Sequence, residues 1–171
     1  EKDILHPLKT RASVLIDTSE LTIHDLRAQL DQWFAPSAQG TLNVAIHSFS
    51  YKRGLPFSAD MVFDCRFLRN PYWEPTLREK TGLDPEIQSF VSADSTCAPF
   101  EARVHDLVLS LLPEFVSEGK SHLSVAFGCT GGKHRSVTIA ERCAVALAEA
   151  GWRVSIKHRD LDRSKRDGAA N

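Results

Sequence analysis

The chain has 171 residues, a length that suits one well-packed domain with a short additional segment. Apolar residues make up 42% and charged residues 25% of it, as in an ordinary globular protein, and no apolar run approaches the roughly 18 residues of a membrane span. The net charge of -1 gives no general attraction to nucleic acid or membranes, so any basic site must be local. The four cysteines are widely spaced and include no CxxC pair, which favours a reducing cytoplasm over a disulfide framework.

Residues 1–40 are predicted to form a short strand–helix arm ahead of the main domain. The apolar run at 14–16 predicts the strand, and Thr22 with Asp25 three residues later resembles a capping box that starts a helix. The stretch APSAQG at 35–40 is typical of a linker. We expect this arm to be the remnant of an upstream domain in a longer protein. The residues that recur on one helical face are Ile23, Leu26, Leu30, Trp33 and Phe34.

Residues 41–163 are predicted to form the main domain, followed by a polar tail at 164–171. Strands alternating with helices indicate an α/β domain, with a mostly parallel sheet flanked by helices. The Pro-rich stretch at 69–88 is expected to be irregular and exposed. Apolar runs predict strands at 41–49, 61–68, 122–129 and 152–158. Helical periodicity predicts helices at 98–118 and 136–150.

The segment FGCTGGKHRSV at 127–137 falls between a predicted strand and a predicted helix, where ligands bind in parallel α/β sheets. Its two glycines let the backbone approach a ligand closely, and the helix start supplies free amides and a positive dipole end. A lysine and an arginine add positive charge, and two hydroxyls add hydrogen bonds. The pattern predicts a site for a phosphate-sized anion. The residues expected to form it are Thr130, Gly131, Gly132, Lys133, His134, Arg135 and Ser136.

The same loop has the Cys129-x5-Arg135 spacing of cysteine-dependent phosphatases. In this alternative, the helix start and Arg135 would stabilise the Cys129 thiolate for attack on a phosphoryl group. Such enzymes usually have a His before the nucleophile, whereas this chain has Gly128. The sequence favours binding, with Cys129 as a small buried residue, and leaves the phosphatase as the alternative. No general acid is singled out among Asp60, Asp64 and Asp84.

Neither a metal site nor a nucleotide loop is predicted. Convergence of Cys129, His134 and His158 is the only metal hypothesis, and the zinc spacing is missing. The stretch EGKS at 118–121 is no Walker A loop, because Glu114 stands where that motif needs a glycine. The histidines interpreted as scattered surface residues are His6, His24, His105 and His122.

Two further stretches are basic: YKRG at 51–54 and the run from 157 to 166. An ordinary polar loop and a solvated tail would explain them as well as binding does. As possible contacts for phosphate or RNA we retain Lys52, Arg53, Lys157 and Arg159.

Four motifs follow one another along the chain: SFSYKRGLP, ADMVFDCRFLRNPYW, TGLD and GCTGGKHRSV. In this order they resemble the C-terminal part of the RapZ/YvcJ family, from about residue 13 to about residue 163. The stretch VLIDTSELTIHDLR resembles the end of that family's N-terminal nucleotide-binding domain. The resemblance implies an upstream Walker-type domain that binds ATP or GTP and is mostly absent here, so no cofactor is expected in this chain.

The resemblance further implies a non-catalytic sensing domain. It would bind an amino-sugar phosphate such as glucosamine-6-phosphate, contact RNA and an RNase or other regulatory protein, form homo-oligomers and need no membrane. Asp64 would hold the amino or hydroxyl groups of the sugar while the loop holds its phosphate. Tyr72 stands where the family has a pocket histidine; its hydroxyl can still donate a hydrogen bond, but it carries no positive charge. The implied pocket residues are Asp64, Thr130, Gly131 and Arg135, with Lys133 and His134 nearby.

Overall fold

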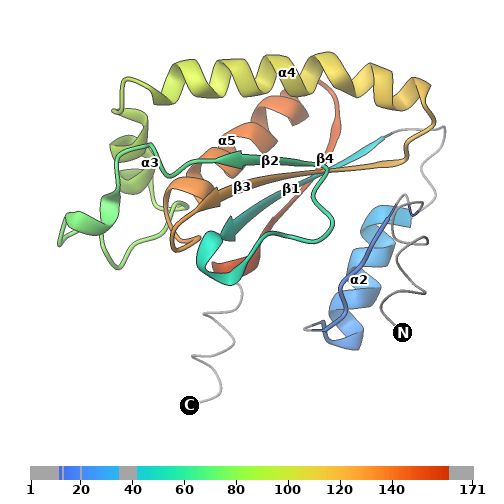
Figure 1. Cartoon of the computed structure of the whole chain (residues 1–171), viewed down its shortest axis with the longest axis horizontal. Helices are drawn as coiled ribbons and strands as arrows, with labels where there is room; N and C mark the ends of the chain where they lie inside the picture. Colours follow the sequence, from blue (N-terminus) through green and yellow to red (C-terminus); the bar gives the residue numbers. More distant parts are fainter. Residues whose placement is uncertain (1–11, 13, 20, 35–41, 162–171) are drawn as a thin grey trace.

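The computed structural model describes residue 12 and residues 14–19, 21–34 and 42–161. Its centre is a four-stranded parallel sheet in the order β2-β3-β1-β4 (Figure 1). The predicted α/β domain with a parallel sheet is confirmed. The strands are β1 (Asn43–Ser50), β2 (Met61–Asp64), β3 (His122–Cys129) and β4 (Arg153–His158).

Helix α5 (Arg135–Glu149) covers one face of the sheet, and α3 (Pro85–Ser92) and α4 (Cys97–Ser117) pack against α5. Helix α5 packs directly on β1, β3 and β4, and α4 runs along the top of the view against α5 (Figure 1). None of the helices in these ranges is both long and apolar enough to cross a membrane.

The core lies between these helices and the sheet. Val44 and Ile46 of β1 face Leu123 and Val125 of β3, and all four side chains are fully buried. Each such side chain stabilises the fold by about 1.5–3 kcal/mol. The strands are thereby fixed, and so are the loops that leave their carboxyl ends.

The predicted helices at 98–118 and 136–150 agree with α4 and α5 to within one residue at each end. The prediction for 69–88 was wrong in part, because this stretch contains the 3-10 turn η2 (Pro71–Trp73) and the start of α3. Pro85 occupies the first turn of α3, where its missing N–H costs nothing. With only Ile87 and Val91 as its buried residues, α3 is too short to give a clear helical period.

The arm contributes helix α2 (Ile23–Phe34), which lies away from α4 in Figure 1. The capping box is confirmed: Thr22 Oγ1 accepts the Asp25 amide at 3.1 Å, and Asp25 Oδ2 accepts the Thr22 amide at 3.0 Å. The predicted strand at 14–16 does not form: none of the described strands pairs with this segment, and Leu15 and Ile16 line a cavity next to the sheet instead. The predicted linker at 35–40 and the tail at 164–171 lie outside the described residues.

The second face of the sheet carries polar side chains beneath the arm. There His47 of β1 is paired in register with Lys157 of β4. Burial, and then the Lys157 ammonium, lower the pKa of His47 from 6.5 to about 4. Further positive charge from His122, His158 and Arg159 acts in the same direction.

His47 should therefore make stability depend on pH. Between pH 6.5 and pH 4 the unfolded chain binds a proton at His47 and the folded chain does not, so stability is lost as the pH falls. We expect His47 to account for a loss of about 3 kcal/mol across this window. Urea unfolding at pH 7, 5.5 and 4 should show a shallower decline in His47→Gln, and an intermediate one in Lys157→Met. Parallel pH profiles for wild type and His47→Gln would contradict the assignment.

Candidate anion-binding site

The loop of residues 130–134 connects the end of β3 to the start of α5 at the carboxyl edge of the sheet. The turn η1 (Tyr51–Arg53), which follows β1, reaches the same edge, as do the residues that follow β4. Ser50 Oγ donates to the Thr130 carbonyl at 2.8 Å. The end of β1 is thus tied directly to the loop.

The two loop glycines, Gly131 and Gly132, differ in whether the structure has room for a side chain at their position. Gly132 has φ +66°, and a Cβ there would lie 2.9 Å from both Asp160 Oδ2 and the Ser50 nitrogen. Asp160 is buried and accepts the Ser50 amide at 2.6 Å, so it cannot easily move away. A Cβ on Gly131, by contrast, would have nothing within 4 Å. Gly132 is needed for close packing, whereas Gly131 leaves the outer side of the loop open.

The loop and the first turn of α5 present backbone donors. Within the described residues, no acceptor receives the amide hydrogens of residues 131–136. The first amides of any helix lack partners inside the helix, and they carry its positive dipole end. This arrangement can bind an anion through several N–H groups at once.

Arg135 lies behind this surface, with only 5% of its area exposed. Its Nη1 donates to the Arg66 carbonyl at 2.5 Å and to the Leu68 carbonyl at 3.0 Å. Its Nη2 lies 3.4 Å from Thr130 Oγ1, on the loop side. The guanidinium therefore fixes the segment after β2 to Thr130 at the start of the loop, and it adds a buried positive charge there.

The Cys129 side chain is buried, with 3% of its area exposed, and its Sγ lies 3.1 Å from Ser136 Oγ. A nucleophilic thiolate would need access to substrate and an arginine free to bind the phosphoryl group. Here Arg135 already donates to two backbone carbonyls. Nothing in this geometry supports the phosphatase alternative.

Asp64, at the end of β2, lies opposite Gly128 of β3 and so beside the loop. Arg66 binds both of its carboxylate oxygens through Nε, at 3.0 and 2.9 Å, and this pairing is the main reason that the pKa of Asp64 is lowered. The Arg66 guanidinium also lies 4.0 Å above the Tyr51 ring. Asp64 remains 42% exposed, so a ligand in the loop can still reach its carboxylate.

The segment of residues 78–82 also contacts the loop, through Lys133. Lys133 Nζ donates to the Arg78 carbonyl at 3.1 Å, and the Lys133 carbonyl accepts the Gly82 amide at 2.9 Å. Burial lowers the pKa of His134, whose Nε2 has no partner among the described residues. Tyr72 is 48% exposed, and the centre of its ring lies 4.9 Å from Cζ of the Arg78 guanidinium. Lys133 and His134 therefore border the loop, while Tyr72 lies farther out along this segment.

The four residues retained as phosphate or RNA contacts fall in two environments. Lys52 and Arg53 are exposed on η1, and Arg53 Nε lies 3.5 Å from Asp160. Arg159 donates to the carbonyls of Ser50 and Gly54, both at 3.0 Å, and Lys157 lies beneath the arm. Only Lys52 and Arg53 are presented to solvent next to the loop.

Sequence reasoning did not assign roles to three residues that shape this site: Arg66, Asp160 and Gly82. Arg66 had a usable signal, because it follows Asp64 by two residues, a spacing that permits a local ion pair. Gly82 lies in the TGLD motif, which by itself gives no reason for a glycine at this position. No sequence pattern marks Asp160 as part of the site. Among the described residues no group of three or more His, Cys, Asp or Glu side chains could hold a metal ion, and His158 instead bonds Ser48 and Glu141.

Fold and loop together define an α/β domain with a candidate anion-binding surface at the carboxyl edge of a parallel sheet. Residues 42–162 match the family model described as the RapZ C-terminal domain, and the chain belongs to the RapZ family. A nucleotide-binding protein of Ruegeria pomeroyi is 56% identical over 98% of this chain and 59% of its own length. A nucleotide-binding protein of Roseobacter denitrificans is 56% identical over 98% of this chain and 57% of its own length. The chain thus spans little more than half the length of these relatives.

Proposed function

We propose that this domain binds a phosphorylated sugar at the loop of residues 129–136 and acts without catalysis. The observation that carries the proposal is the row of amides at 131–136, which lack acceptors in the described residues and are backed by the buried guanidinium of Arg135. Backbone N–H groups with a helix dipole favour a phosphate, and a buried arginine adds to that preference.

The sugar would extend from the loop toward Asp64. An ammonium group on the sugar would donate a charge-assisted hydrogen bond to this carboxylate, which already accepts from one cation, Arg66. We therefore propose an amino-sugar phosphate, with glucosamine-6-phosphate as the first candidate. Tyr72, in place of the family histidine, would contribute at most a neutral hydrogen bond from the outer side.

Thermal unfolding with added ligands tests this proposal. A ligand at 100 times its Kd stabilises the folded chain by about 2.7 kcal/mol, and we expect this effect from glucosamine-6-phosphate, with less from glucose-6-phosphate and phosphate. Asp64→Asn should abolish the preference for the amino sugar but keep the response to phosphate, whereas Asp106→Asn, exposed on α4, should change neither. Cys129→Ser should keep binding too. The proposal fails if none of the three anions stabilises the protein.

We extend the proposal to the larger protein and its partners. The complete protein would bind ATP or GTP through the domain upstream, assemble as a homo-oligomer in the cytoplasm, and act on RNA together with an RNase or another regulatory protein. Lys52 and Arg53 support an RNA contact, because they are exposed and because Ser50, just before η1, is bonded to the loop. A ligand that changed the position of the loop would therefore also change the position of Lys52 and Arg53 through Ser50.

A further inference from the structure

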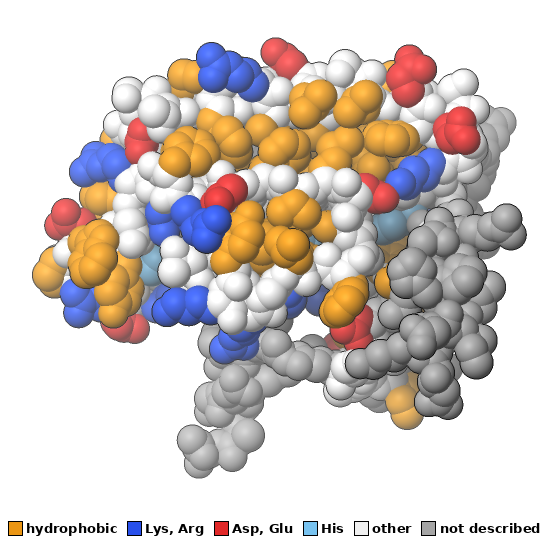
Figure 2. Space-filling view, in the orientation of Figure 1, with side chains coloured by type: hydrophobic (Ala, Val, Ile, Leu, Met, Phe, Trp, Pro, Cys, Tyr) orange, Lys and Arg blue, Asp and Glu red, His pale blue; other side chains and the backbone are white. Residues whose placement is uncertain are grey.

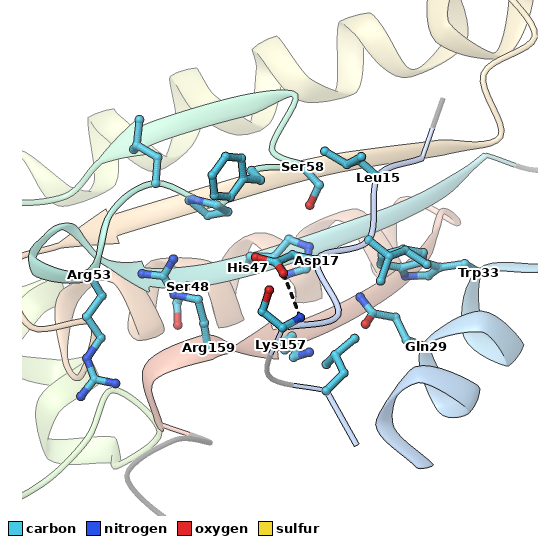
Figure 3. A pocket seen from close by; sticks show the side chains of 16 residues that line it. Leu15, Asp17, Gln29, Trp33, His47, Ser48, Arg53, Ser58, Lys157 and Arg159 are labelled. Carbon is cyan, nitrogen blue, oxygen red and sulfur yellow. Dashed lines mark hydrogen bonds between the residues drawn. The ribbon is translucent and has the colours of Figure 1, made fainter. Parts of the chain in front are cut away.

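A cavity of about 310 Å³ lies between the arm and the second face of the sheet (Figure 3). Trp33 and Gln29 of α2 and Leu15 and Asp17 of the arm face the sheet across it. This volume falls within the range of small-molecule sites. None of residues 128–136 lines it, so it is separate from the loop.

The cavity walls combine apolar and cationic groups. Trp33 and Arg53 lie at opposite ends in Figure 3, with His47 and Lys157 between them. Leu55, two residues after Arg53 in the sequence, adds an apolar side chain that is 57% exposed. A ligand could therefore place an apolar body against the walls while its charge lies near the middle of the cavity.

The cations of the cavity are not equally free. Arg159 and Arg53 share the carboxylate of Asp160, which offsets much of their charge. For Lys157, no carboxylate partner occurs in the described part of the chain, and its neighbour in register is His47. Asp17, also in the cavity wall, accepts the Ser19 amide at 3.0 Å and keeps its negative charge, so an anion is favoured only where it contacts Lys157 directly. Lys157 is thus the group best placed to attract an anion.

A polar atom in the cavity wall also needs a partner. Gln29 Oε1 is inaccessible to solvent and has no hydrogen-bond partner in the described residues. An amide oxygen left unsatisfied in this way costs free energy, and a ligand in the cavity would reach this atom only after the Gln29 side chain turned toward it. The Trp33 ring beside it is held 4.5 Å from the His122 ring, so this wall is fixed to β3.

We propose that this cavity is a second ligand site, for a small organic anion with an apolar body and one phosphate, sulfonate or carboxylate group. The anion would pair with Lys157, and the apolar body would lie against Trp33 and Leu15. Because the ligand would contact both the arm and the sheet, its binding would fasten the arm to the domain. This site does not depend on the loop ligand proposed above.

The test uses anilinonaphthalene sulfonate, an aromatic anion, as the probe. Nuclear magnetic resonance spectra of the whole chain should contain three indole N–H signals, from Trp33, Trp73 and Trp152. We expect saturable binding that shifts the Trp33 signal and leaves the other two in place. Shifts at Trp73 or Trp152 instead of Trp33, or binding without saturation, would overturn the site.

Variants and competitors test the chemistry of the proposal. Lys157→Met should weaken probe binding about fivefold, as expected for losing one charge in contact with solvent. Arg153→Met, which removes a charge from the same strand outside the cavity, should leave binding unchanged. The uncharged analogue phenylnaphthylamine should bind at least about tenfold more weakly than the sulfonate. Equal losses in the two variants would contradict a separate anion site.

Discussion

Replacing Gly82 with alanine should lower the free energy of unfolding by about 3 kcal/mol, at the upper end of the usual cost of overpacking. A Cβ at this position would lie 2.3 Å from the His134 carbonyl oxygen, 2.6 Å from the Thr138 nitrogen and 2.6 Å from Val137 Cβ. Two of these atoms belong to the backbone of the first turn of α5, which cannot rotate away as a side chain can. The new methyl group would push this turn off the sheet.

The same variant should also weaken anion binding, because the displaced turn carries the amides of the proposed site. Gly131→Ala is the matched control: it adds the same methyl group in the same loop, where nothing lies within 4 Å. Urea unfolding should show a small change for Gly131→Ala, with the large one confined to Gly82→Ala. Similar stabilities for the two variants would mean that the loop does not pack on Gly82 as described.

Several apolar side chains of α4 and of the edge strand β2 are exposed. Figure 2 shows an apolar band along α4, with a second group of apolar side chains below it. Leu107 and Val116 of α4 are 47% and 39% exposed, and Val62 of the edge strand β2 is 40% exposed. Helical periodicity predicted α4 correctly, and Leu107 belongs to the apolar side of this helix. Periodicity finds the apolar side of a helix, and it does not say whether that side meets the core of the same chain.

The fold could be predicted because its signals are local. The buried strands β1 and β3 contain short apolar runs, and α4 and α5 have clear periodicity. The arm shows the limit of such signals. Its capping box is a contact between Thr22 and Asp25 and was predicted, whereas a strand at 14–16 would need a pairing partner that no local pattern can supply.

The position of the candidate site in the fold could be predicted from the sequence, but the hydrogen bonds that hold it together could not. The order of strand, glycines, cations and helix placed the loop at the carboxyl edge of the sheet. The two carbonyls that Arg135 binds lie 69 and 67 residues away in the sequence, and the bond from Ser50 to Asp160 spans 110. Such contacts depend on the packing of β2 and β4 around the loop. A reading of the loop alone therefore treats Arg135 as exposed to the ligand, when much of its hydrogen bonding is internal.

This internal bonding gives a second large effect: Arg135→Met should cost about 2–4 kcal/mol of stability even without ligand. Methionine fills similar space but leaves the carbonyls of Arg66 and Leu68 without their donor. Each buried carbonyl left without a hydrogen bond costs about 1–3 kcal/mol. Chemical denaturation without ligand measures this loss. Arg103→Met, which removes an exposed arginine from α4, is the control and should stay within about 0.5 kcal/mol of wild type.

Arg135→Lys separates the structural role of this residue from its charge. Lysine keeps the positive charge behind the amides, but its ammonium lacks the fork that reaches two carbonyls and Thr130 together. We expect a loss of stability close to that of Arg135→Met, with phosphate affinity reduced about tenfold in the lysine variant and abolished in the methionine variant. If the methionine variant were as stable as wild type and lost only phosphate binding, the guanidinium would serve the ligand alone, and the bonds to the segment after β2 would contribute nothing to the fold.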